Sequence, residues 1–288
     1  MVPERVGKIL SAAVWITAAA AAALLFTGAF IEPNRLVVRR SVLELPGLPR
    51  EAEGMKVLLV ADTHFGSSFT DRLRRDRIVK RVRELDADIC FLLGDYIAVG
   101  GLPGWNAMSE KELKSFFSSL KAPLGCYAVL GNHELWYGRR RMIRLLESSG
   151  IRMIENRMIR IKGVYIAGIP ESETAPFDRQ SFEQMIKGHS PLLLLTHKGK
   201  VIRRIKNAPG SITFAADTHG GQVRIPGKGS LSNLLKNSGE LPPGLSTQWK
   251  KQLYITTGSG GHRWNFRLFC PPEIALVTLT KQKEKEHI

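Results

Sequence analysis

Acidic, histidine and amide side chains follow five strand-like segments of this 288-residue sequence. The apolar runs 56–61, 89–93, 126–130, 192–195 and 212–216 lead into Asp62, His64, Asp95, Asn132, His133, His197, Asp217 and His219. Ligands of open α/β sheets bind beyond the carboxyl ends of the strands, so we expect these side chains to gather in one place. Carboxylate, imidazole and amide ligands without a thiolate suit manganese, iron, zinc or magnesium. Their number is sufficient for two ions that share one bridging carboxylate.

Taken singly, each of these motifs has a plainer interpretation. A lone Asp-x-His arises by chance in many chains, and Gly94-Asp95 alone is typical of a turn. An asparagine after Gly131 often caps a loop. His197 alone is typical of a hydrogen-bonded core histidine. The coincidence of five such motifs at strand ends nevertheless favours a metal site.

Helical patterns alternate with the strand-like runs. The helical patterns lie at 71–85, 109–120 and 138–149, and further strand-like runs lie at 158–169, 253–257 and 274–279. Ser109 and Glu112 have the spacing of a capping box. Buried strands that alternate with helices predict an α/β architecture in which most sheet faces are covered. The stretch 225–250, rich in glycine, proline and serine, is expected to form a long loop over the active face.

An uncharged apolar run lies near the N-terminus, at residues 9–31. As a helix it would extend about 34 Å at ~1.5 Å per residue, compared with a hydrocarbon core of ~30 Å. A cleaved signal peptide is the alternative, because Thr27-Gly28-Ala29 resembles a cleavage site, but the length of the run favours a retained anchor. Two basic residues precede the run and Arg35, Arg39 and Arg40 follow it. This asymmetry places the body in the cytoplasm.

We divide the chain accordingly into five parts. They are a basic flank 1–8, a transmembrane anchor 9–31, an irregular linker 32–54, a main domain 55–280 and a charged tail 281–288. A hydrophobic content of 43% excludes a disordered chain. The three cysteines are far apart and odd in number, which excludes a disulfide scaffold and agrees with a reducing compartment.

The chain is strongly basic, with 42 Lys and Arg against 26 Asp and Glu and a net charge of +16. Residues 1–31 carry only one unit of this charge, which leaves +15 on the remainder. Such a body favours an anionic partner: nucleic acid, a phospholipid surface or a phosphorylated substrate.

The ordered motif series resembles that of calcineurin-like metallophosphoesterases over roughly residues 55–280. The resemblance is closest to their membrane-anchored bacterial branch, since Gly220-Gly221-Gln222 and Pro271-Pro272-Glu273-Ile274 are also present. It implies a βαβαβ sandwich of two mixed sheets flanked by helices, and an enzyme that uses two divalent metal ions to hydrolyse a phosphoric ester or diphosphate bond.

By the same resemblance, the metal ligands divide between two ions. The first ion would be bound by Asp62, His64 and His219, the second by Asn132, His197 and Asp217, with Asp95 bridging them. Two ions in this arrangement would polarise the phosphoryl group and activate water near neutral pH. His133 would protonate the leaving oxygen, because a histidine that binds metal cannot also shuttle a proton. Glu134 would orient a neighbouring side chain.

Asp217 departs from the family pattern. The family usually has Gly-His-x-His where this chain has Ala216-Asp217-Thr218-His219. A carboxylate can still coordinate metal, and its charge favours manganese or magnesium over zinc. The alternative is a weakened second site, and with it a binding protein of low activity.

Basic and apolar residues near these motifs suggest the substrate. Arg139, Arg140 and Arg141 could bind a second phosphate or an anionic headgroup, or could form a solvated face. The resembled branch includes enzymes that convert UDP-2,3-diacylglucosamine to lipid X and UMP in lipid A biosynthesis, and a phosphodiesterase of another substrate is an alternative. This chain would then act at the bacterial inner membrane on a lipid-linked phosphate. A nuclease is the rival, but the basic clusters lack interleaved aromatic residues, so no nucleic acid is expected.

Overall fold

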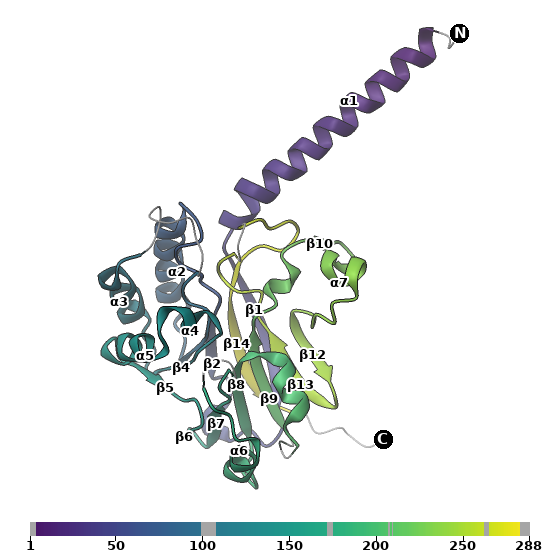
Figure 1. Ribbon diagram of the computed structural model, residues 1–288. Helices are drawn as coiled ribbons and strands as arrows, with labels where there is room; N and C mark the ends of the chain where they lie inside the picture. Colours follow the sequence, from purple (N-terminus) through teal and green to yellow (C-terminus); the bar gives the residue numbers. More distant parts are fainter. Residues whose placement is uncertain are drawn as a thin grey trace, which may run out of the picture.

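The computed structural model describes residues 4–98, 108–171, 175–206, 208, 210–261 and 265–282. Two six-stranded sheets face one another, and helices lie along the outside (Figure 1). Both sheets are mixed: the first has one antiparallel pairing among parallel ones, and the second has an antiparallel pairing at each edge. The predicted α/β sandwich of two mixed sheets is therefore confirmed.

The first sheet carries the first three motif-bearing strands. Its order is β1 (Val37–Leu45), β14 (Glu273–Lys281), β2 (Lys56–Val60), β3 (Ile89–Leu93), β4 (Cys126–Val129) and β5 (Ile151–Met153). Its outer face packs against α2 (Asp71–Leu85), α3 (Glu110–Ser119) and α5 (Arg139–Ser148). Successive side chains of a strand point to opposite faces, so Leu58 and Val60 pack under these helices.

The second sheet carries the other two motif-bearing strands. Its order is β12 (Gly244–Gln248), β13 (Lys251–Ile255), β9 (Ser211–Ala216), β8 (Leu192–Lys198), β7 (Val164–Gly168) and β6 (Met158–Ile161). The predicted hairpin at 158–169 is the antiparallel pair of β6 and β7. Helix α6 (Arg179–Ile186) packs on the outer face through Phe182 and Ile186.

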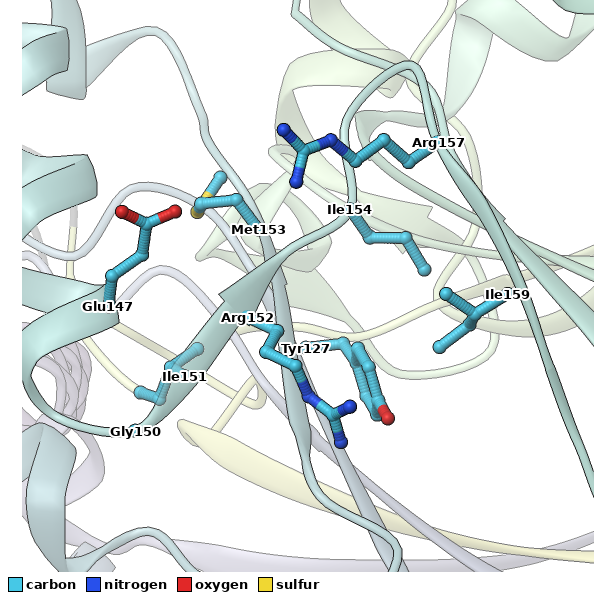
Figure 2. A pocket seen from close by; sticks show the side chains of 9 residues that line it. All are labelled: Tyr127, Glu147, Gly150, Ile151, Arg152, Met153, Ile154, Arg157 and Ile159. Carbon is cyan, nitrogen blue, oxygen red and sulfur yellow. The ribbon is translucent and has the colours of Figure 1, made fainter.

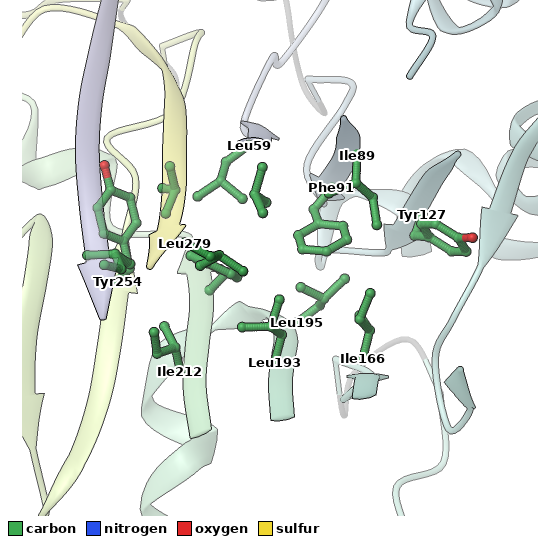
Figure 3. Packing of buried hydrophobic residues seen from close by; sticks show 14 of the residues in the cluster. Leu59, Ile89, Phe91, Tyr127, Ile166, Leu193, Leu195, Ile212, Tyr254 and Leu279 are labelled. Atoms are coloured by element: carbon green, nitrogen blue, oxygen red, sulfur yellow. The ribbon is translucent and has the colours of Figure 1, made fainter. Parts of the chain in front are cut away.

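The main core lies between the two sheets. Figure 3 shows Leu59 and Phe91 of the first sheet pointing toward Leu193 and Leu195 of the second, and all four side chains are fully buried. Strands covered on both faces have almost uninterrupted apolar sequences, which is why the runs at β3 and β8 were recognisable. The rigid sandwich fixes where each strand ends, and hence where the motif residues lie.

The segment 32–54 is not the irregular linker that the sequence suggested. Its residues 37–45 form β1, which pairs in parallel with β14. The prediction was wrong because β1 is an edge strand whose exposed positions include Arg39 and Arg40, so it lacks a continuous apolar run. The proline and glycine residues that punctuate the segment lie on either side of the strand.

The stretch 225–250 is also more ordered than expected. It contains the short strand β11 (Gly229–Ser230), the helix α7 (Leu231–Lys236) and strand β12, and it begins at the last residue of β10 (Arg224–Ile225). Ser230 accepts a hydrogen bond from the backbone of Asn233 and so caps α7. The predicted capping box of Ser109 and Glu112 is present at the start of α3.

The N-terminal helix α1 (Glu4–Phe26) projects away from the body (Figure 1). A π-helical turn (Thr27–Ile31) and a 3-10 turn (Glu32–Asn34) continue it. The segment Val6–Asn34 is long and apolar enough to cross a membrane, by length and composition, and its most apolar part is not buried within the protein. The predicted span 9–31 lies inside it. Parts of the predicted flank 1–8 and tail 281–288, namely 1–3 and 283–288, lie outside the described residues.

The base of this N-terminal segment is fixed to the body. Gly28 is buried, and its carbonyl oxygen accepts a hydrogen bond from the backbone of Arg267 at 3.0 Å. A Cβ atom at Gly28 would overlap the ring of Phe266, so only glycine allows this close approach. Six residues further on, the carbonyl oxygen of Asn34 accepts from Arg77 Nη1 of α2 at 2.7 Å. The helix therefore has two attachments to the body.

Candidate metal centre

Six of the eight predicted side chains form one cluster. Three overlapping groups have ligand atoms that all lie within 4.8 Å of one another: Asp62 with His64 and His219, Asp62 with Asp95 and His197, and His64 with Asp95 and His133. The groups share Asp62, His64 and Asp95, so they form one continuous site. The motif residues of both sheets meet there, at the carboxyl ends of the parallel strands, as the sequence predicted.

Asp95 lies at the middle of this cluster. Its Oδ2 atom is 3.3 Å from His197 Nε2, 3.6 Å from His64 Nε2 and 3.8 Å from His133 Nε2. Its Oδ1 atom accepts a hydrogen bond from the backbone N–H of His133 at 2.9 Å. This carboxylate thus belongs to two of the three ligand groups and adjoins the third through His64.

Asp217 and Asn132 lie at the rim of the cluster. Asp217 Oδ1 is 3.6 Å from His197 Nε2, and its side chain is 38% exposed, in contrast to the buried Asp62 and Asp95. Asn132 is half-buried and immediately precedes His133, whose N–H binds Asp95. Asp217 is outside the three groups found among the described residues, although it adjoins one of them through His197.

The backbone at the strand ends is unusual. Asp62, His64, Asp95, Asp217 and His219 all have positive φ angles, between 41° and 73°. Such angles are uncommon for residues other than glycine, and they concentrate at functional sites. Five of the predicted ligands therefore lie on sharply turned backbone directly after their strands.

Two glycines allow the loops of β3 and β4 to approach each other. A Cβ atom on Gly94 would overlap the backbone of Gly131, and one on Gly131 would overlap Asp95. This contact is the reason that both motifs begin with glycine. It also brings the backbone N–H of His133 to Asp95.

The site has unmatched negative charge that a cation would neutralise. Both carboxylate oxygens of Asp62 are buried and accept no hydrogen bond from any described residue. Burial raises the pKa of Asp62 well above its ordinary value, because a buried carboxylate without a partner is unfavourable. The donor set of carboxylates and imidazoles suits a divalent ion. The residues present thus fit the metal ions that the sequence predicted.

His197 is oriented as metal-binding histidines are. Its Nδ1 atom lies 2.8 Å from the carbonyl oxygen of Leu93, which can only accept, so Nδ1 carries the proton and Nε2 faces Asp95. Burial opposes a charge on His197, but the charges of Asp95, Asp62 and Asp217 outweigh it and raise its pKa. A bound cation would interact favourably with the same carboxylates.

Glu134 fixes the backbone around Asp95. Its buried carboxylate accepts hydrogen bonds from the backbone of Asp95 at 3.0 Å, Tyr96 at 2.8 Å and Gly131 at 2.7 Å. Burial and the charge of Asp95 raise the pKa of Glu134 to about 8. Among the three groups described above, none includes Glu134. This geometry matches the orienting role expected from the sequence.

The sequence assigned no role to Arg267, which is fully buried behind His219. Its Nη2 atom is 3.4 Å from His219 Nδ1 and donates to the carbonyl oxygens of Thr257 at 2.8 Å and Gly260 at 2.6 Å. It therefore holds the loop before β14 against a predicted ligand. The signal in the sequence was its position shortly before Pro271-Pro272.

The three arginines of α5 have different surroundings. Arg139 Nη2 lies 2.7 Å from Glu155 Oε2, and Arg141 Nη2 lies 2.7 Å from Glu110 Oε2. Arg141 also stacks on Tyr137. Arg140 is exposed. Two of the three predicted phosphate contacts are thus paired within the protein.

A cavity of about 340 Å³ lies away from the metal cluster. Figure 2 shows its lining, which comes from β4, β5 and β6 with the end of α5 and includes Tyr127, Glu147, Arg152 and Arg157. None of the predicted site residues lines it. This cavity is a separate feature at the edge where β5 and β6 end their sheets.

Comparisons with known proteins agree with this chemistry. The family profile described as calcineurin-like phosphoesterase matches residues 55–207, more than half of the chain. The chain is 26% identical to the UDP-2,3-diacylglucosamine pyrophosphatase LpxG of Chlamydia muridarum, over 86% of this chain and 90% of that protein. It is 29% identical to an uncharacterized metallophosphoesterase of Aquifex aeolicus, over 90% of this chain and 97% of that protein.

The solved structures give weaker matches. The 5'-nucleotidase precursor of Thermus thermophilus superposes with a TM-score of 0.46 at 14% identity, covering 78% of this chain and 54% of that one. The family profile spans the motifs of β2, β3, β4 and β8, where five of the six clustered residues lie. The chain therefore belongs to the calcineurin-like phosphoesterase family and is a hydrolase of phosphoric ester or diphosphate bonds.

Proposed function

We propose that this chain is a two-metal phosphodiesterase or diphosphatase that acts on a lipid-linked substrate at a membrane surface. The best candidate reaction is hydrolysis of UDP-2,3-diacylglucosamine to lipid X and UMP, a step of lipid A biosynthesis. The observation that carries the proposal is the set of overlapping ligand groups joined at Asp95. The relatives named UDP-2,3-diacylglucosamine pyrophosphatase support the choice of substrate.

Each side chain of the cluster has a defined task in this proposal. Asp62, His64 and His219 would hold one ion, and Asn132, His197 and Asp217 a second, with Asp95 between them. Bound divalent ions polarise phosphoryl oxygens and lower the pKa of water. Manganese is the best candidate, and iron, zinc and magnesium also suit the donor set.

His133 would act as the general acid. Its ring packs edge-on against His64, with centroids 4.5 Å apart, and it is the predicted residue nearest Asp95 that is not assigned to an ion. A histidine in this position can give a proton to the leaving oxygen while the carboxylate of Asp95 keeps its own hydrogen bond to the His133 backbone.

Exposed apolar side chains support a lipid-linked substrate. They lie in the segments after β2, β4 and β9 and in the loop before β14, and they are Phe69, Leu73, Leu135, Trp136, Leu234, Leu235 and Phe269. In Figure 1, α7 and the loop before β14 lie at the end of the body from which α1 departs. Apolar side chains at that end could insert into a bilayer surface and contact a substrate whose acyl chains stay in the bilayer.

We further propose that α1 crosses the bacterial inner membrane once, with the body in the cytoplasm. The three basic residues that follow the span support this orientation. The three cysteines are all free and buried, which fits a reducing compartment. Arg140 is a candidate to contact the substrate phosphates. Arg139 and Arg141 could do so only after their ion pairs with Glu155 and Glu110 break. No nucleic acid partner is expected.

The direct test uses the full chain in detergent with Mn²⁺ and UDP-2,3-diacylglucosamine. We expect the masses of lipid X and UMP to appear, chelation by EDTA to stop the reaction, and added Mn²⁺ to restore it, because the buried carboxylates need a cation. If the protein hydrolysed bis-p-nitrophenyl phosphate but not the lipid, the proposed substrate would be refuted, whereas the proposed phosphodiesterase reaction would stand. Failure on both substrates with all four metals would refute the proposed activity.

Asp217 raises a second candidate function, that of a weakened enzyme that mainly binds its ligand. Its side chain is the most exposed of the carboxylates near the cluster, and it replaces a histidine of the family pattern. If the site works as proposed, the wild type should bind two ions, and Asp217→His should shift the preferred metal from Mn²⁺ toward Zn²⁺. Metal content by mass spectrometry and turnover with each metal would measure this. A wild type that holds one ion and gains turnover only in Asp217→His would instead support the weakened enzyme.

A further inference from the structure

A basic pocket lies at the base of the N-terminal segment, apart from the metal cluster. It encloses about 260 Å³ and is lined by Asn34, Arg35, Leu36, Arg77, Lys80 and Arg81. Four of these six residues are cationic and none is acidic. They come from two elements, the end of the segment that α1 begins and one face of α2, which the hydrogen bond from Arg77 to Asn34 joins at 2.7 Å. The pocket is therefore built by the attachment of that segment to the body.

The carboxylates near the pocket do not balance its charge. Glu32 pairs with Arg35 at 3.1 Å, and Glu84 pairs with Arg81 at 2.9 Å and with Lys80 at 4.0 Å. Four cations thus face two carboxylates, and Glu84 is itself well exposed, where ion pairs are weak. Within the described part of the chain, the recorded partner of Arg77 is the neutral oxygen of Asn34. An anion could therefore bind Arg77 in the pocket while these two carboxylates keep their partners.

The position of the pocket along the chain indicates what kind of anion reaches it. The segment able to cross a membrane ends at Asn34, which is also a lining residue. If that segment lies in a bilayer, the pocket is at the level of the lipid headgroups. Phe30 and Ile31, just before the pocket, are about half exposed and would lie beside acyl chains. The arrangement thus offers cations for a headgroup phosphate and apolar surface for the attached chains.

We propose that this pocket binds the phosphate of an anionic phospholipid from the bilayer that the N-terminal segment crosses. Guanidinium groups match phosphate oxygens in shape and charge, and Arg35, Arg77 and Arg81 present three of them around one cavity. The bound lipid would bridge α2 and the end of the membrane segment. This site is distinct from the hydrolytic one, and the proposal does not depend on the identity of the substrate.

The test uses the full chain in a neutral detergent with EDTA, so that phosphate cannot bind through metal ions. Dioctanoyl phosphatidylglycerol should raise the melting temperature in a saturable way. Dioctanoyl phosphatidylcholine and inorganic phosphate at equal concentration should raise it much less. Arg77→Gln/Lys80→Gln/Arg81→Gln should increase the half-saturating concentration of phosphatidylglycerol by about tenfold or more, since charge-assisted bonds are lost. Glutamine keeps the helix propensity of α2.

A matched control removes the same charge elsewhere. Lys111→Gln/Lys114→Gln/Lys121→Gln changes three exposed lysines that do not line the pocket, and its response should equal that of the wild type. Because Arg77 also holds Asn34, the double variant Lys80→Gln/Arg81→Gln tests the pocket with that bond intact and should lose part of the response. If both triple variants changed the response to phosphatidylglycerol equally, general charge attraction would explain the binding and the proposal would be overturned. If inorganic phosphate raised the melting temperature as much as the lipid does, the pocket would be a site for free phosphate, which would also overturn the proposal.

Discussion

Replacing Asp95 by asparagine is expected to lower kcat/KM by on the order of 10³-fold or more, because several kcal/mol of electrostatic stabilisation depend on the metal ions that it would join. Its Oδ2 atom is within 3.8 Å of three imidazole rings, and it belongs to two of the three ligand groups. An amide has a similar shape but no negative charge, so it cannot bridge two cations equally. Metal content should fall from two ions per chain toward one or none.

The control for Asp95→Asn is the same chemical change at Asp86. That carboxylate is 93% exposed, and it lies at the end of α2, away from the metal cluster. Asp86→Asn should leave both metal content and turnover unchanged. Steady-state kinetics and elemental analysis of the two variants side by side would measure the difference. Full activity in Asp95→Asn with two ions bound would remove Asp95 from the proposed mechanism.

Replacing His133 by asparagine is expected to lower kcat by about 10²- to 10⁴-fold, the usual contribution of a general acid, with metal content unchanged. The hydrogen bond from position 133 to Asp95 comes from the backbone, so the substitution leaves it in place. The loss should depend on the leaving group. It should be large for diphenyl phosphate and small for bis-p-nitrophenyl phosphate, since p-nitrophenolate departs without needing a proton.

Metal content separates two roles for His133. The structure also places this residue in a ligand group with His64 and Asp95, so it is near enough to bind an ion itself. A His133→Asn variant that loses one ion, with equal rate losses on both substrates, would identify His133 as a ligand. Retention of both ions with a loss that depends on the leaving group would identify it as the acid.

The arrangement of the metal cluster followed from the sequence because its strands are buried on both faces. The runs before Asp62, Asp95 and His197 are almost purely apolar, so both the strands and their ends were recognisable. Strand β1 was not, because it alternates exposed and packed positions, and its partner β14 is more than 200 residues away in the chain. Pairing over such a distance leaves no local pattern in the sequence.

Side-chain partners were the least predictable part of the site. The carboxylates that pair with Arg139 and Arg141 are 16 and 31 residues distant, in other elements, so the basic run alone could not reveal them. The buried position of Arg267 depends on carbonyl oxygens gathered from a loop, and carbonyl groups have no signature in sequence. The positive φ angles of the ligands could not be predicted either. Glycine often marks such a backbone conformation in a sequence, whereas aspartate and histidine do not.

The close approach of Gly28 to Phe266 has a consequence for how the enzyme would meet its substrate. A catalytic domain joined to its anchor by a flexible linker would reorient in solution, and its active site would face the bilayer only part of the time. Here the backbone of Gly28 in the N-terminal segment is hydrogen-bonded to Arg267, and Arg267 contacts His219 of the metal cluster. With that segment in a bilayer, the reactive face is held at a constant height and angle. Encounter with a lipid then becomes a search by lateral diffusion in two dimensions, governed by surface density and not by bulk concentration.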